Sequence, residues 1–142
     1  MKFVRIATLE KGWHDTDVLL LHVSFQLLVD FMEKEQPGKS IDWSSDESHR
    51  KTWKEIERLY HWWKHERPTR RSPLDDRKIK RPPFRRMKIA GSENSELVQH
   101  DRNKYPEYYT ALKLEMKLER KWFEEDQHNL HALIAVREHL WT

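Results

Sequence analysis

Six prolines and only three glycines decide where this chain of 142 residues can form regular structure. Pro37-Gly38 interrupts the first third, prolines recur four times between residues 68 and 83, and the last one is Pro106. Because proline fixes φ and lacks a backbone donor, helices end before it or begin with it. The scarcity of glycine disfavours turn-rich β folds and glycine-rich phosphate loops. Three stretches remain that are long enough for helices.

The apolar patterning predicts helices at about 15–35, 46–66 and 96–141. The last helix can start anywhere between Glu96 and Pro106, and residues 2–8 can form a short strand or an extended arm. We therefore expect an all-α protein of one domain, 1–142, built as a compact bundle of three main helices. A short N-terminal extended segment and a long basic, proline-rich loop at 67–90 complete this prediction.

The composition narrows the class of protein further. Seven Trp, five Phe and four Tyr argue against disorder although 36% of the residues are charged. The absence of cysteine excludes disulfides, thiolate metal sites and a cysteine nucleophile. The longest apolar stretch, near Val18–Met32, is interrupted by polar residues and is too short to span a bilayer. We expect an intracellular protein without a membrane partner.

Positive charge is concentrated in residues 67–90, which hold ten Lys and Arg against two Asp. The other residues hold 17 basic and 22 acidic side chains, so the net charge of +3 hides a polarised molecule. A basic stripe beside an acidic body is typical of a protein that binds a polyanion: nucleic acid, a nucleotide or an acidic protein surface. The alternatives are pairing with the acidic body of the same chain and docking on a second copy.

Aromatic residues come directly before this basic segment. Trp53, Ile56, Tyr60 and Trp63 share the predicted core face of the second helix, and Trp62 lies about 100° away from them. An exposed Trp62 could stack on a base while arginines pair with phosphates. The predicted binding residues are Trp62, Arg70, Arg71, Lys80, Arg81, Arg85, Arg86 and Lys88.

Two sets of polar residues interrupt apolar helical faces. They are His22, Gln26, Asp30 and Glu33 in the first helix, and Glu115, Glu119, Asp126 and Arg137 in the third. Charges inside apolar faces are costly unless they are paired or bind a cation. One interpretation is a structural network in which Arg137 neutralises Asp126 or Glu119. The other is an Mg²⁺ or Mn²⁺ site formed by Asp30, Glu33, Glu115 and Glu119, with His22 as general base.

The metal interpretation is similar to the all-α nucleoside-triphosphate pyrophosphohydrolases, in which paired acidic motifs on adjacent helices bind magnesium. Those motifs are E-x-x-E and E-x-x-D, whereas this chain has Glu115-x-x-x-Glu119 and Glu124-x-Asp126. No residue role is therefore transferred from that family. A metal-dependent nucleotide phosphohydrolase stays an alternative.

Three segments resemble small uncharacterised proteins of tailed bacteriophages: WHDTDVLLLHVSFQLLVDFMEKE, EIERLYHWWKHERPTRR and LIAVREHLWT. The resemblance implies expression in the cytoplasm of an infected bacterium and supplies no catalytic residue. Small phage proteins often act by binding, for example by inhibiting a host enzyme or countering a defence system. We therefore expect a non-enzymatic binding or inhibitor protein that needs no cofactor. A structural component of the virion is a further alternative.

Overall fold

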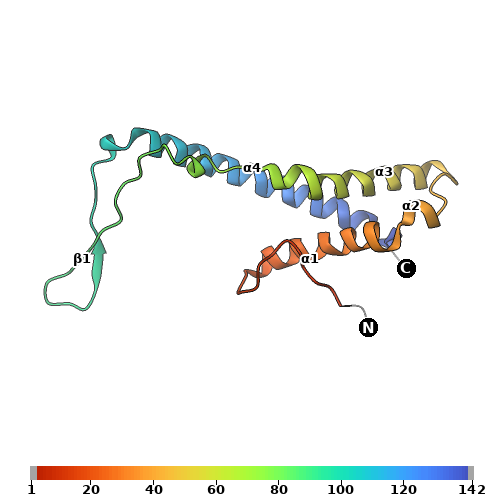
Figure 1. Ribbon diagram of the computed structural model, residues 1–142, viewed down its shortest axis with the longest axis horizontal. Coiled ribbons are helices and arrows are strands. Elements are labelled where there is room, and N and C mark those ends of the chain that lie inside the picture. The colour runs from red at the N-terminus through yellow and green to blue at the C-terminus, as the bar shows by residue number, and fades with distance from the viewer. Residues whose placement is uncertain (1–2, 141–142) are drawn as a thin grey trace. The chain divides into compact units, whose positions relative to one another are not determined.

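The computed structural model describes residues 3–140 and is mostly helical (Figure 1), as predicted. It contains three main helices and one small two-stranded sheet. The chain divides into two compact units. Unit 1 comprises Met1–Arg70 and Phe123–Thr142, and unit 2 comprises Arg71–Trp122.

The first main helix, α1, spans Thr16–Asp30 and continues into a π-helical turn at Phe31–Glu35. Together they cover the predicted range 15–35. Gln36 ends this segment in the left-handed conformation, with φ of +48°, and the proline that follows starts the short helix α2, Pro37–Ser40. The chain thus reverses at the proline–glycine pair that the sequence marks as a break.

The second main helix, α3, spans Glu47–His61 and is followed by a π-helical turn at Trp62–Glu66. Its start is fixed by Asp46, whose Oδ1 accepts a hydrogen bond of 2.9 Å from the backbone N–H of His49. A 3-10 turn at Arg67–Thr69 ends the helical run at the proline in its second position.

The third main helix, α4, spans Pro106–Val136 and passes into a 3-10 turn at Arg137–His139. It begins at the latest of the starts that the sequence allows, because Ser95–Leu97 form strand β2 instead of helix. Proline at the first helical position has no N–H to leave unsatisfied. Within residues 3–140, no helix has both the length and the apolar character needed to cross a membrane.

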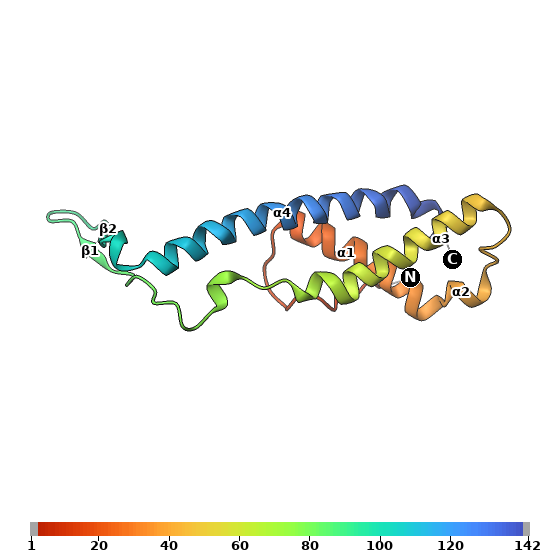
Figure 2. The same ribbon diagram turned by 90° about the horizontal axis from the view of Figure 1, so that it is seen from above.

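The core of unit 1 lies among α1, α3 and the C-terminal part of α4. Figures 1 and 2 both show these three segments side by side. Phe25, Leu28, Ile56 and Leu59 are fully buried, and Leu130, Leu133 and Val136 join them from α4. The ring of Phe25 stacks on Trp63 with centroids 4.5 Å apart. Burial of these apolar side chains is the main stabilisation of the unit.

The N-terminal residues 3–8 form no strand, in contrast to one of the two predictions for this segment. Residues 3–6 have no regular structure, and Ala7 and Thr8 lie in a turn that contacts α1. The backbone N–H of Ala7 donates a 3.0 Å hydrogen bond to Gln26 Oε1, and Thr8 Oγ1 lies 2.7 Å from His22 Nδ1. These contacts satisfy two of the polar groups on the otherwise apolar α1.

Unit 2 holds most of the basic segment, which folds into short elements. A 3-10 turn at Pro73–Asp75 precedes strand β1, Arg86–Lys88, which pairs antiparallel with β2. All six strand residues are exposed. Gly91 lies in the connecting loop with φ of +78°, a conformation that other residues rarely adopt.

The core assignment yields a test with matched deletions. Ile56 is fully buried whereas Ile134 of α4 is 50% exposed. We expect Ile56→Ala to lower the free energy of unfolding by about 2–5 kcal/mol, because it leaves a cavity in a packed core. Ile134→Ala should change it by about 0.5 kcal/mol or less. Urea denaturation followed by circular dichroism measures both, and equal losses would contradict this core.

Candidate functional site

The first arginines of the basic segment belong to the fold of unit 1. Arg67 donates two hydrogen bonds of 3.0 Å to the carboxylate of Asp126. Arg70 Nη2 lies 2.9 Å from Asp126 Oδ1 and 2.8 Å from Glu125 Oε2. The side chains of Arg70 and Asp126 are each only 16% exposed. Two arginines therefore share one largely buried carboxylate, with a second carboxylate at its edge.

This arrangement corrects two predictions. Arg137 is exposed and does not neutralise Asp126, because Arg67 and Arg70 already do so. Arg70 is held inside the protein, so it is not the externally directed binding residue that the sequence suggested. Arg71 also takes part in a contact within the protein, although its side chain is exposed.

Trp62 was predicted to be exposed, and that prediction is wrong: it is 2% exposed. Its ring packs 5.2 Å from that of Phe25, and its Nε1 donates a 2.9 Å hydrogen bond to Glu125 Oε1. The core face of α3 is centred on Ile56 and Leu59, so a residue three positions after Leu59 also faces inward. The π-helical turn that starts at Trp62 places both this residue and Trp63 in the core.

Glu125 shows how this cluster balances charge against burial. Burial alone would raise the pKa of its carboxyl group, but hydrogen bonds from Trp62 and then Arg70 outweigh it and lower the pKa below its usual range. The carboxylate therefore stays charged beside the guanidinium group. The cluster thus holds the residues that follow α3 against the C-terminal part of α4 within unit 1.

The polar stripe of α1 is also satisfied internally. Gln26 Nε2 donates a 2.9 Å hydrogen bond to Asp30 Oδ1, and Lys34 pairs with the same carboxylate at 2.8 Å. His22 lies edge-on to Trp63 with centroids 5.0 Å apart. Burial and then the positive charge of Arg67 lower the pKa of His22 to about 4, so the imidazole is neutral at neutral pH.

The carboxylates of the alternative metal site have other partners or stand apart. Glu33 accepts a 2.9 Å hydrogen bond from Tyr60 and pairs with Lys64 at 2.8 Å, and the bond from Lys64 and then that from Tyr60 lower the pKa of Glu33. Glu115 accepts a hydrogen bond from Ser72, and Glu119 is exposed.

Asp30 and Glu33 belong to unit 1, whereas Glu115 and Glu119 belong to unit 2. Among residues 3–140, no three His, Asp or Glu side chains are grouped closely enough to hold a metal ion. Nothing in the described geometry therefore favours the Mg²⁺ or Mn²⁺ interpretation over the structural network.

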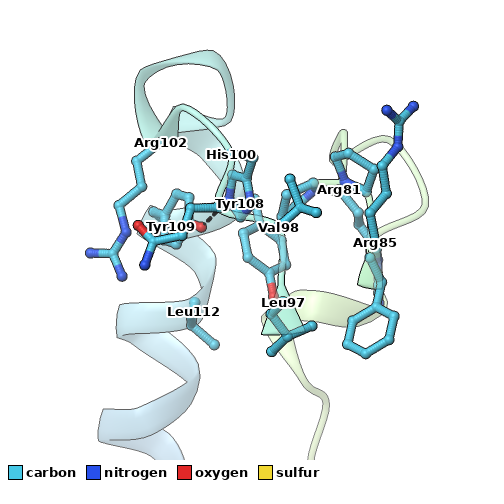
Figure 3. A pocket seen from close by; sticks show the side chains of 13 residues that line it. Arg81, Arg85, Leu97, Val98, His100, Arg102, Tyr108, Tyr109 and Leu112 are labelled. Atoms are coloured by element: carbon cyan, nitrogen blue, oxygen red, sulfur yellow. Dashed lines mark hydrogen bonds between the residues drawn. The ribbon is translucent and has the colours of Figure 1, made fainter. Parts of the chain in front are cut away.

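Unit 2 contains a pocket of about 640 Å³ between the chain that leads into β1, the chain that follows β2 and the first turns of α4 (Figure 3). Its lining combines basic residues and the neutral Gln99 with aromatic and aliphatic side chains. The basic and aromatic residues that line it are Arg81, Phe84, Arg85, His100, Arg102, Tyr108 and Tyr109. No Asp or Glu is among the lining residues. The pocket thus combines hydrogen-bond donors with ring faces.

A stack of rings and cations forms the α4 side of this pocket. The His100 and Tyr109 rings lie parallel, with centroids 5.9 Å apart, and a hydrogen bond joins His100 Nε2 to the Tyr109 hydroxyl. Arg102 places its guanidinium 4.9 Å from the centre of the Tyr109 ring. Figure 3 shows Arg102 and Tyr109 on one side of the pocket and Arg81 and Arg85 on the other. Mutual stacking holds these side chains in place before any ligand arrives.

Within the described part of the chain, five cations in or near this pocket lack the carboxylate partners that Arg67 and Arg70 have in unit 1. Arg81 donates to the backbone carbonyl of Leu74, and the Arg86 guanidinium lies 5.5 Å from the centre of the Phe84 ring. No ion pair with a carboxylate within residues 3–140 involves Arg81, Arg85, Arg86, Lys88 or Arg102. Of the predicted binding residues, Arg81 and Arg85 line the pocket, Arg86 and Lys88 lie in β1, and Lys80 lies 5.5 Å from the Tyr105 ring.

Sequence reasoning missed the aromatic partners of these arginines. The predicted binding residues did not include Phe84, His100, Arg102, Tyr108 or Tyr109. A usable pattern was present, because Arg85-Arg86 follows Pro-Pro-Phe and Arg102 lies next to a run with three tyrosines, Tyr105, Tyr108 and Tyr109. The β1–β2 pairing, which joins these two segments, cannot be read from either segment alone.

No protein-family model, no curated protein and no solved structure matches this chain. The resemblance to tailed-phage proteins therefore stays a prediction, and the function must be argued from the chemistry of the site.

The arginine–carboxylate cluster predicts a large effect of one substitution. Asp126→Asn leaves Arg67 and Arg70, which are both largely buried, without the carboxylate that they share. We expect the free energy of unfolding to fall by about 3 kcal/mol. This value is at the lower end for breaking a buried ion pair, because the two arginines and the carboxylate keep some contact with water. Urea denaturation measures the loss. Glu119→Gln, at an exposed carboxylate, is the control, and a similarly small effect of both variants would refute the role of Asp126.

His22 predicts how stability depends on pH. The pKa of its imidazole is about 4 in the folded protein and 6.5 in the unfolded chain. Between these values the unfolded chain binds a proton that the folded protein does not. The stabilising contribution is therefore complete above pH 6.5 and is lost as the pH falls toward 4. His22→Gln should show a shallower loss of unfolding free energy over this range, and identical slopes would contradict the assignment.

Proposed function

We propose that this protein is a non-enzymatic binding protein whose unit 2 engages a polyanionic partner. The observation that carries the proposal is the basic and aromatic pocket, which has three arginines and no acidic residue in its lining. Guanidinium groups pair bidentately with phosphates and carboxylates. The partner contacts proposed here are Arg81, Arg85, Arg86, Lys88 and Arg102, in place of the buried Trp62 and Arg70.

The distribution of charge between the two units supports this proposal. Unit 2 carries 14 Lys and Arg against 8 Asp and Glu, whereas the rest of the chain carries 13 against 16. Uncompensated positive charge on a small unit is unfavourable for folding through self-repulsion. A polyanion removes that repulsion on binding, and the long-range field accelerates its association.

The contrast within the basic segment is a second support. Arg67 and Arg70 are held by carboxylates of unit 1. Arg81, Arg86 and Arg102 of unit 2 instead have a backbone carbonyl or a ring face as neighbour. Their charge is therefore available to an external anion. The proposed context is that of a small phage protein acting as an inhibitor inside an infected bacterium, which rests on the sequence resemblance alone.

Charge reversal of one pocket arginine and of its neighbour in β1 tests the proposal. We expect Arg85→Glu combined with Arg86→Glu to weaken binding to heparin and to inorganic polyphosphate at least about tenfold, or about 1.4 kcal/mol. The loss follows because attraction to two anionic groups becomes repulsion. The salt dependence of binding should fall by about two units of slope for two lost contacts. Heparin-column elution and fluorescence anisotropy measure these changes, with far-UV circular dichroism to verify folding.

The control alters the net charge by the same amount elsewhere. Arg5→Glu combined with Lys54→Glu changes two exposed cations of unit 1. We expect this variant to keep most of the affinity, since its reversed charges lie outside the pocket. Equal losses in the two variants would show that only net charge matters, and a wild-type protein that binds neither probe would refute the proposal.

A further inference from the structure

We infer that the polyanion is a single-stranded nucleic acid, with bases stacked on the aromatic side chains of unit 2 and phosphates paired with its arginines. This inference rests on the proposed function and specifies its ligand. A charged surface alone would serve any polyanion. The geometry of the pocket restricts the ligand further. The size of the pocket, its ring faces and a second pocket beside it each add a requirement that the ligand has to meet.

The size of the pocket requires more than an anionic group. Its volume of about 640 Å³ lies within the range of sites that enclose a whole small molecule, about 300–1,000 Å³. A carboxylate or a phosphate fills only a small part of such a space. Apolar surface from Leu97, Val98 and Leu112 lines the remainder. The ligand therefore has a flat or apolar group beside its charge, as a nucleotide has in its base.

The exposed ring of Phe84 also indicates a ligand with a flat group. This side chain is 74% exposed and lines the pocket together with its neighbours Pro83 and Arg85. A phenylalanine in that position gains little from the fold, since hydrophobic stabilisation comes from burial. The Pro82-Pro83 pair restricts the backbone before it, and Arg86 lies over its ring at 5.5 Å. A restrained ring with cations beside it is the arrangement on which unpaired bases stack.

A second pocket indicates a chain and not an isolated nucleotide. It has a volume of about 560 Å³, shares Arg102, Tyr109 and Leu112 with the first, and continues to Lys113 and Met116. Its lining also contains no acidic residue. The stacked pair of Arg102 and Tyr109 thus stands between two basic pockets. Successive bases can occupy the two pockets while the phosphate between them meets the Arg102 guanidinium.

The stacking requirement selects single strands. In a duplex each base is stacked on its neighbours and paired, so its face is not available to a protein ring without unstacking. An acidic peptide offers carboxylates to the arginines but has no regularly repeated ring for two successive pockets. A single strand supplies one ring and one phosphate per unit, which matches the alternation of ring and cation in this unit.

Substitution of Phe84 separates stacking from charge. The affinity of the whole 142-residue chain is measured by fluorescence anisotropy with five fluorescein-labelled probes. They are single-stranded DNA and single-stranded RNA of one mixed sequence, the corresponding blunt duplex, inorganic polyphosphate and poly-glutamate. We expect Phe84→Ala to weaken single-strand binding about tenfold and to leave polyphosphate binding unchanged. Phe84→Trp should restore the affinity. Phe3→Ala, at a ring that is 81% exposed in unit 1, is the matched control and should have no effect.

The outcomes distinguish this inference from the proposed function. Binding of single strands that Phe84→Ala weakens and Phe84→Trp restores supports the inference. It is overturned if Phe84→Ala leaves single-strand binding unchanged, if the duplex binds as tightly, or if poly-glutamate binds more tightly per charge. In those three cases sensitivity to reversal of Arg85 and Arg86 would leave the proposed function standing. If wild-type protein binds none of the probes, the proposed function itself fails.

Discussion

Asp126 is the carboxylate on which the arrangement of unit 1 depends most. It accepts hydrogen bonds from Arg67 and lies within 2.9 Å of Arg70, so it fixes the end of the α3 segment against α4. Because the carboxylate is largely buried, loss of a guanidinium partner would strongly destabilise the protein. The rings of Trp62 and Trp63 pack beside these arginines, with Arg67 4.8 Å from the centre of the Trp63 ring. Charge pairing and aromatic packing therefore support each other at this point.

The same cluster neutralises the first part of the basic segment. Glu125 and Asp126 are adjacent in α4, and they neutralise the arginines at the start of the segment. The arginines around β1 have no such carboxylates beside them within the described residues. A segment that looks uniform in sequence thus has two roles. Its first part anchors the helices of unit 1, and its second part presents cations next to exposed rings.

The sequence predicted the helices well because their limits depend on local chemistry. Proline and an Asp cap act within a few residues, so the bounds of α1 and α3 follow closely from Asp46, Pro37 and Pro68. The start of α4 was less certain because β2 depends on pairing with β1, a contact that local patterns do not encode. The arrangement of the units as one compact bundle stays a prediction.

The candidate site was harder to predict for a related reason. Trp62 was judged by its angle on an ideal helix, whereas its burial depends on Leu59 and on a π-helical turn. Arg70 was counted as a surface cation because its partners are far away in sequence. The pocket combines Phe84 with Tyr109, and neither residue indicates a site alone. Counting charges could predict the sign of the charge on a ligand. Which rings lie beside each arginine could be learned only from the three-dimensional structure.

In the proposed function, charge and ring faces have different roles. This division would allow one small unit both to associate rapidly with a ligand and to discriminate among ligands. The net positive charge acts at long range and attracts any polyanion, with little discrimination. Under the proposal, selectivity comes at contact distance, where the ligand places a flat group against Phe84 and fills the space beside Leu97. The stack of His100, Tyr109 and Arg102 holds its geometry through its own contacts, so less conformational freedom is lost on binding. In the proposed function, the cations of unit 2 favour encounter with the ligand, and its rings select among the ligands that arrive.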